Sequence, residues 1–414
     1  MNVSLGIRLL EVDPQSAAGK AALDSGVRLM EELSAGEQDV RVALAGVLEN
    51  QAWANGTTAE QRRRCLERVR TIREELAKAE HAGSAAVQWL ALTYMNLVAA
   101  GAREPQEEVA YLGRVRELCR TLDFHNRANV RGAQVFVAAT VQLADWLLPS
   151  KPAKASELYD EAIALAEQLL QRDGENEHLR DLLAMSYNGK GRSLRGADAI
   201  PWFQKTCAVR ERLLLDQRRT LSAPDMTRRV LLQGYHNLAL EQIRALRTLE
   251  AAHTCERIIQ VGEDLVPVWP QDSTIKYVIG VASWHLGAIR SPFGFSPERL
   301  ALTTKAIKYL SEAVEAVPRD APARSELCWM LEELAAHEAR DGKRDAALER
   351  YSRTAGHLRE LRAQKAASPK DVERFKSVLR AIVRIQRELG QSSDAAASEL
   401  RELEPSKPAG DLKP

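Results

Sequence analysis

Sequence motifs of enzyme active sites are missing from this chain of 414 residues. Its eight histidines show neither HxxxH nor HExxH spacing, and no Cys/His cluster with metal-ligand spacing occurs. There is no GxSxG nucleophile turn, no P-loop and no GxGxxG following a strand. We therefore expect no catalytic residues, no metal and no cofactor, and we do not expect an enzyme.

Aromatic residues are also scarce, at 5% of the chain, so alanine and leucine must do most of the packing. Opposite charges nearly cancel to a net charge of +1, which argues against a protein that binds polyanions over its whole surface. The five cysteines include no CxxC pair, which indicates free buried thiols in a reducing compartment. The start of the chain shows no secretory signal pattern, so we expect a cytoplasmic protein.

Only one uncharged run, residues 82–102, is long enough to span a bilayer. Ser84, Gln88, Thr93 and Asn96 interrupt it, and such polar groups cost free energy in lipid. We therefore expect a buried helix here and no contact with a membrane.

What the chain does contain is a repeated spacing of apolar and small residues. Small side chains at fixed positions allow two helices to approach to roughly 8–10 Å. The clearest copy places Leu331, Leu334, Ala335, Gly342, Ala347, Tyr351 and Thr354 at positions 4, 7, 8, 15, 20, 24 and 27 of a unit. Further copies contain Leu238, Ala239, Ala251, Cys255 and Ile258; Ala199, Phe203 and Thr206; Leu5, Gly6, Leu9, Ala18, Ala22 and Ser25; and Leu379, Ile382, Gly390 and Ala395.

This spacing resembles the tetratricopeptide repeat (TPR), a helix–turn–helix unit of about 34 residues. The resemblance implies an all-α fold, an α-solenoid in which about nine hairpins stack into a right-handed superhelix over residues 1–403. Residues 404–414 are expected to form a disordered tail. The helix pairs are expected near 1–34, 37–80, 83–122, 127–172, 177–219, 225–266, 272–318, 322–365 and 369–403.

A narrower resemblance covers about forty residues. Residues 186–191 (SYNGKG) and 203–213 (FQKTCAVRERL) look like the repeat arrays found downstream of bacterial eukaryotic-type serine/threonine kinases. This chain has no Gly-rich loop, no HRD and no DFG, so kinase activity is not carried over.

The TPR resemblance also implies that certain positions of each first helix line a concave face that binds peptides or partner proteins. A lining rich in arginine would bind carboxylates, so we expect a protein or peptide partner with acidic groups. A solvated helix face for the arginines and a core role for the two tryptophans are the alternatives. The positions are Asn188, Arg192, Arg195, Gln233, His236, Arg244, Trp284, Trp329, Glu332, Arg340, Arg380, Arg384 and Arg387.

The function that follows is a non-catalytic scaffold or adaptor. The alternatives are a ligand- or peptide-responsive regulator and, less favoured, a helical-repeat RNA binder. The arginine-rich stretch 210–229 lacks the interleaved aromatic residues that stack on bases, so we expect no nucleic acid partner. Residues 291–297, with two phenylalanines between prolines, are a second candidate contact surface. The sequence indicates neither the partner's identity nor the oligomeric state.

Overall fold

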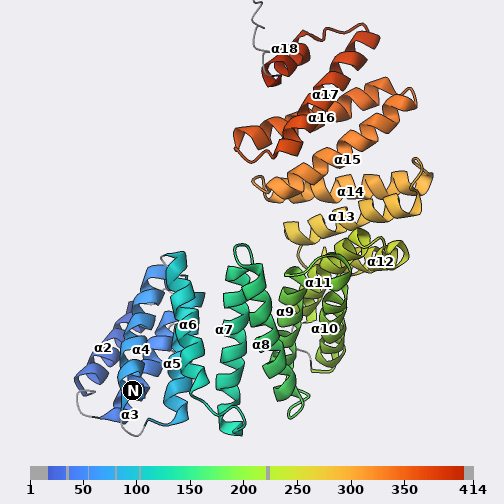
Figure 1. Ribbon diagram of the computed structural model, residues 1–414. Helices are drawn as coiled ribbons and strands as arrows, with labels where there is room; N and C mark the ends of the chain where they lie inside the picture. Colours follow the sequence, from blue (N-terminus) through green and yellow to red (C-terminus); the bar gives the residue numbers. More distant parts are fainter. Residues whose placement is uncertain are drawn as a thin grey trace, which may run out of the picture. The chain divides into compact units, whose positions relative to one another are not determined.

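A computed structural model describes residues 17–33, 37–54, 56–79, 82–101, 104–220 and 224–404, and every regular element in them is helical (Figure 1). The chain divides into an N-terminal unit, Met1–Leu194, and a C-terminal unit, Arg195–Pro414. Each unit is described by itself, and one uninterrupted solenoid over 1–403 stays a prediction.

In the N-terminal unit each described helix packs on the next one along the chain, as a series of hairpins requires. The first helices of successive hairpins also meet, since α5 contacts α7 and α7 contacts α9. The helices are α2 (Ala17–Leu33), α3 (Gln38–Ala52), α4 (Ala59–Lys78), α5 (Ser84–Ala99), α6 (Pro105–Arg120), α7 (Val130–Leu147), α8 (Pro152–Leu170) and α9 (Glu177–Arg192), with a 3₁₀ turn η1 (Arg127–Asn129) before α7.

The C-terminal unit repeats the arrangement: consecutive helices pack in order, and α13 contacts both α11 and α15. It opens with a 3₁₀ turn, η2 (Gly196–Asp198). Its helices are α10 (Ile200–Thr220), α11 (Pro224–Arg244), α12 (Thr248–Leu265), α13 (Ser273–Arg290), α14 (Pro297–Ala316), α15 (Ala321–Arg340), α16 (Arg344–Ala363), α17 (Pro369–Glu388) and α18 (Asp394–Leu403). The predicted all-α helical-repeat fold is therefore confirmed.

Helix ends follow the residues that predicted them. Ser368 accepts a hydrogen bond from the backbone N–H of Asp371 at 3.2 Å, and the Asp371 carboxylate accepts one from the N–H of Ser368 at 2.9 Å. This reciprocal capping box starts α17, with Pro369 at its first position. Gly342 and Gly390 follow α15 and α17 with φ of +76° and +70°, a conformation that glycine adopts without strain.

The predicted repeat register places small residues where helices cross. Tyr159, at position 24 of its unit, fills the space beside Gly189 of the next first helix so closely that a Cβ there would lie 2.1 Å from the ring. The alanines at position 20 are fully buried in five hairpins: Ala155, Ala199, Ala251, Ala306 and Ala347.

Two ends of the array depart from the predicted register by one residue. In α18, Ala395 is exposed and Ala396 packs on the core, since the turn between Gly390 and α18 is longer than the turn between Gly342 and α16. In α2, Ala18 and Ser25 are exposed, whereas their neighbours Gly19 and Gly26 are buried. The first helix predicted for the opening pair, and the predicted tail apart from Glu404, lie outside the described residues.

Residues Ser84–Ala99 of the uncharged run form α5, in which Gln88, Leu90, Ala91, Thr93, Tyr94 and Leu97 are buried. Its Gln88 side chain donates hydrogen bonds to the carbonyl of Ala128 and to Asn129 Oδ1, both at 3.1 Å, so the polar group is satisfied inside the protein. Across the part of the chain that the structure describes, no helix combines the length and apolar character needed to cross a membrane. All five cysteines are free thiols, and only Cys65 is partly accessible.

Candidate functional site

The predicted lining residues of the fifth pair do not share one helix. Asn188 is half-buried on α9, and Arg192, its last residue, places Nη1 2.8 Å from Asp145 Oδ1. Arg195 follows the helix and belongs to the C-terminal unit, where its Nη1 lies 3.9 Å from a carboxylate oxygen of Glu241. The glycine-rich end of α9 stops the helix before Arg195. The prediction of an inward-facing Arg195 had assumed that this residue is helical.

On α11 the predicted residues are internal or paired. Gln233 donates a hydrogen bond to Asn237 Oδ1 at 3.2 Å. His236 is buried with its ring 5.8 Å from that of Tyr277, and burial lowers the pKa of His236 to about 4. Arg244 forms an ion pair with Glu241, the carboxylate that Arg195 also approaches.

The predicted arginines at the C-terminal end are exposed, and most of them have polar partners. Arg380 Nη2 lies 2.8 Å from Glu404 Oε1, and the Nε of Arg387 lies 3.4 Å from the hydroxyl of Ser393. Arg340 donates to the carbonyl of Ala336 at 3.2 Å. Arg384 has neither an ion pair nor a hydrogen bond to any residue that the structure describes. Acidic neighbours therefore neutralise part of the predicted basic lining.

Two tryptophans and three polar residues form a connected surface across three successive first helices. The rings of Trp284 on α13 and Trp329 on α15 have centroids 4.5 Å apart, and the Arg374 guanidinium lies 6.0 Å from the Trp329 ring. Glu332 accepts from Arg374 Nε and from the Ser377 hydroxyl, each at 3.1 Å. We call these five residues the tryptophan face. Sequence reasoning found three of its members and missed Arg374 and Ser377, whose spacing on α17 complements Glu332.

A second set of polar contacts supports the tryptophan face. The indole N–H of Trp284 donates to Glu333 Oε2 at 2.6 Å, and Glu333 forms an ion pair with Arg299 of α14. The Trp329 side chain remains 41% exposed. The surface thus combines a fixed aromatic side chain with accessible hydrogen-bonding groups.

The two phenylalanines of the loop 291–297 lie in different environments. Phe295 stacks on His337 with centroids 4.5 Å apart and planes 6° from parallel, and Arg299 lies 4.6 Å from the same ring. Phe293 is 99% exposed. The loop is therefore anchored through one ring and presents the other to solvent.

Two arginines of the stretch 210–229 make internal contacts, and the side chains of residues 217–224 lie outside those that the structure describes. Arg210 is buried and donates to the carbonyl of Val230 at 2.7 Å. Arg229 binds Asp272 at 2.6 Å. Among the described residues, no group of three or more His, Cys, Asp or Glu side chains is placed to hold a metal ion.

No protein-family model matches the sequence, and no curated protein is similar to it. Solved structures resemble it at low identity. A human IFIT1 dimer with m7Gppp-AAAA is 13% identical with a TM-score of 0.39, covering 98% of this chain and 91% of that one. A STAND ATPase with a tetratricopeptide repeat sensor from Pyrococcus horikoshii is 11% identical with a TM-score of 0.48, covering 88% and 52%. The C-terminal part of a TPR repeat-containing protein from Cytophaga hutchinsonii is 11% identical with a TM-score of 0.39, covering 77% and 98%.

At TM-scores below 0.5 these likenesses carry no argument about function. The helical-repeat fold rests on the sequential packing of hairpins and on the buried repeat positions of the chain itself. The comparisons give no support to the resemblance to kinase-associated arrays.

Proposed function

We propose that this protein is a non-catalytic scaffold that binds a segment of a partner protein on the tryptophan face. The observation that carries the proposal is Trp329, which is partly exposed on a first helix and is backed by the ring of Trp284. Exposed tryptophans in well-supported positions are the residue type that most often dominates a protein interface. The free thiols fit a reducing compartment, so we place the scaffold in the cytoplasm.

The tryptophan face is already ordered before a partner binds. Glu333 fixes the Trp284 indole, and Glu332 fixes the Arg374 and Ser377 side chains. Binding therefore loses little side-chain entropy at these residues, which favours affinity. The side chains of Arg374 and Glu332 are still 18% and 23% exposed, so they can also hydrogen-bond to a peptide backbone.

Arg384 indicates which polar group the partner should present. It follows Ser377 by seven residues on α17, two helical turns along the same side, at about 10 Å. Because no described residue pairs with Arg384, a carboxylate of the bound segment would gain a charge-assisted hydrogen bond there. The bound segment is therefore expected to present an apolar or aromatic side chain to Trp329 and an acidic group to Arg384.

The test selects peptides from a random phage-displayed library on the immobilised full chain, then measures each synthetic peptide by fluorescence anisotropy. Trp329→Ala should weaken binding by about tenfold or more, the effect of a typical interface hot spot. Arg384→Glu should weaken acidic peptides most.

The control is Arg353→Glu, an exposed arginine on α16 that donates a hydrogen bond to the Ser311 hydroxyl at 3.3 Å. It should leave binding unchanged. The proposal is wrong if the peptides bind the Trp329 and Arg384 variants with the same affinity as the original chain and the melting temperatures of the variants are also unchanged.

A further inference from the structure

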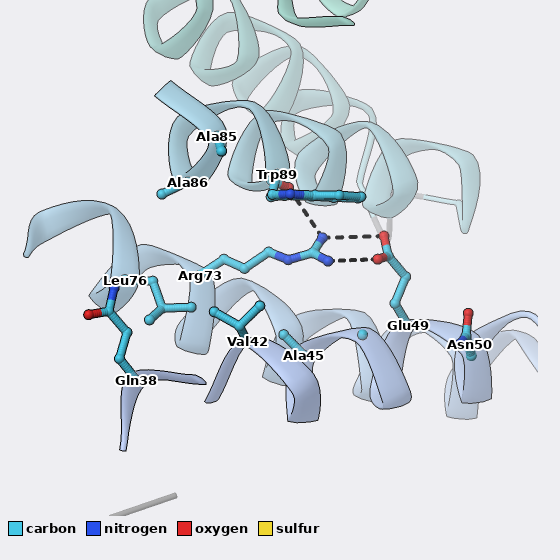
Figure 2. Close-up of a pocket in the computed structure, with 11 residues that line it drawn as sticks. Gln38, Val42, Ala45, Glu49, Asn50, Arg73, Leu76, Ala85, Ala86 and Trp89 are labelled. Atoms are coloured by element: carbon cyan, nitrogen blue, oxygen red, sulfur yellow. Dashed lines mark hydrogen bonds and ion pairs between the residues drawn. The ribbon is translucent and has the colours of Figure 1, made fainter. Parts of the chain in front are cut away.

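A hollow in the N-terminal unit is lined by the first helices α3 and α5 and by Arg73 and Leu76 of α4 (Figure 2). Its volume is about 570 Å³, within the usual range for small-molecule sites of roughly 300–1,000 Å³. We call it the α3–α5 hollow. The apolar side chains that line it are Val42, Ala45, Leu76, Ala85, Ala86 and Trp89.

Small side chains create this space. Ala45 and Gly46 on α3 face Ala85 and Ala86 on α5, and none of them reaches across. A Cβ added at Gly46 would have no neighbouring heavy atom within 4 Å. The hollow is therefore a feature of residue size at this interface, and a larger side chain at Gly46 would enter it.

One wall of the hollow is a rigid polar network centred on Arg73 of α4. Figure 2 shows its guanidinium between the Trp89 ring and the Glu49 carboxylate. Arg73 Nη2 lies 2.7 Å from Glu49 Oε2, its Nη1 donates to Thr93 Oγ1 at 2.8 Å, and its guanidinium carbon is 5.1 Å from the Trp89 ring. Asn96 donates to the other oxygen of Glu49 at 2.6 Å. These contacts hold Trp89 and the charged pair in place.

The network also defines the charge that a ligand can carry. Arg73 and Glu49 neutralise each other, so neither an anion nor a cation gains a net attraction from the pair that would offset the loss of its hydration. Arg73 is only 6% exposed, and its hydrogen bonds to the described residues all run through Nη1 and Nη2, which leaves its Nε–H without an acceptor among them. A neutral oxygen acceptor on a ligand would satisfy that donor.

We propose that the α3–α5 hollow binds a small uncharged apolar molecule that carries one hydrogen-bond acceptor. Its apolar body packs against Val42, Leu76 and Trp89, and its carbonyl or hydroxyl oxygen accepts from Arg73 Nε. This site lies in the N-terminal unit and does not depend on the partner-binding role proposed for the tryptophan face.

The probe is the uncharged ketone dye Prodan, whose emission shifts to the blue in an apolar site. The full chain should bind it saturably, and the anionic dye ANS should bind more weakly. Gly46→Leu fills the hollow and raises helix propensity, so the variant should fold yet bind Prodan about tenfold or more weakly.

The matched control is Gly113→Leu on α6, where an added Cβ also meets nothing within 4 Å. It should bind Prodan as the original chain does. The proposal fails if Prodan does not bind saturably, or if the two leucine variants bind it equally. If Prodan fails to bind but a phage-selected peptide loses affinity in Gly46→Leu, the hollow takes a partner's side chain and the small-molecule proposal is wrong.

Discussion

The two units differ in how side chains occupy one space between neighbouring first helices. Between α3 and α5 it is lined by alanines and a glycine and stays hollow. Between α13 and α15 two tryptophans fill it, with ring centroids 4.5 Å apart. Both units have the same helical-hairpin packing and the same buried alanines at position 20. The repeat register thus fixes the backbone, and the residues that face the neighbouring first helix decide whether the surface has a pocket or an aromatic ridge.

The largest expected effect tests whether the register is shared by the two units. Ala155→Glu on α8 and Ala347→Glu on α16 each put a charge and extra volume at a fully buried helix crossing. Each should lower the free energy of unfolding by about 3 kcal/mol or more. Urea unfolding measures the loss. Ala395→Glu, at an exposed position of α18, is the control and should change stability by less than about 0.5 kcal/mol. A tolerant response at either buried alanine would mean that the two units do not share one register.

The next effect compares the filled interface with the hollow one. Trp284→Ala removes a half-buried ring that packs on Trp329 and binds Glu333, so it should cost about 2–4 kcal/mol. Trp89→Ala removes a ring that borders a space already empty, and about 1–2 kcal/mol is expected. Thermal unfolding of both variants gives the difference. Equal losses would show that the tryptophan pair adds no packing beyond that of a lone ring.

The sequence predicted the helical backbone of this molecule, and it did not predict the contacts and the hollow on its surface. The positions of the helices that the structure describes, α2 to α18, were predictable because helix-breaking residues and buried small residues recur at fixed spacing, as Ser368, Gly342 and Ala347 illustrate. The ion pairs were not predictable, because the sequence pattern of an arginine on an exposed face is the same whether or not a carboxylate such as Asp145 lies opposite it. The α3–α5 hollow was missed because an alanine that lines a cavity and one that fits a helix crossing have the same sequence signature.

Acid should weaken the C-terminal unit before the N-terminal unit. Burial lowers the pKa values of His236 and His285 to about 4, well below the ordinary pKa of a histidine, which is about 6.5. A folded-state pKa below the unfolded value means that the unfolded chain binds more protons, so stability falls as pH drops from 6.5 towards 4. The C-terminal unit should lose about 2 kcal/mol or more between pH 7 and pH 5.

Hydrogen exchange followed by mass spectrometry at the two pH values, corrected for intrinsic exchange rates, measures this loss in α11 and α13 against α3 and α5. His236→Gln removes one titrating group and should reduce the pH dependence of α11 and α13 only. Equal loss of protection in the two units would rule out the buried histidines as the cause.

The smallest effect concerns a position where the chain departs from the register without changing the backbone. Leu246 follows α11 with φ of +58°, at the place that Gly342 occupies after α15 with φ of +76°. The following N–H groups make equivalent bonds, Arg247 to the Gln242 carbonyl at 2.8 Å and Lys343 to the Glu338 carbonyl at 2.9 Å. Leu246 is 83% exposed, so Leu246→Gly relieves left-handed strain with little loss of burial and should stabilise the fold by about 1 kcal/mol or less. Gly342→Leu should have the opposite sign. If differential scanning calorimetry finds Leu246→Gly destabilising, the exposed leucine has a packing partner and the backbone at this turn depends on its side chain.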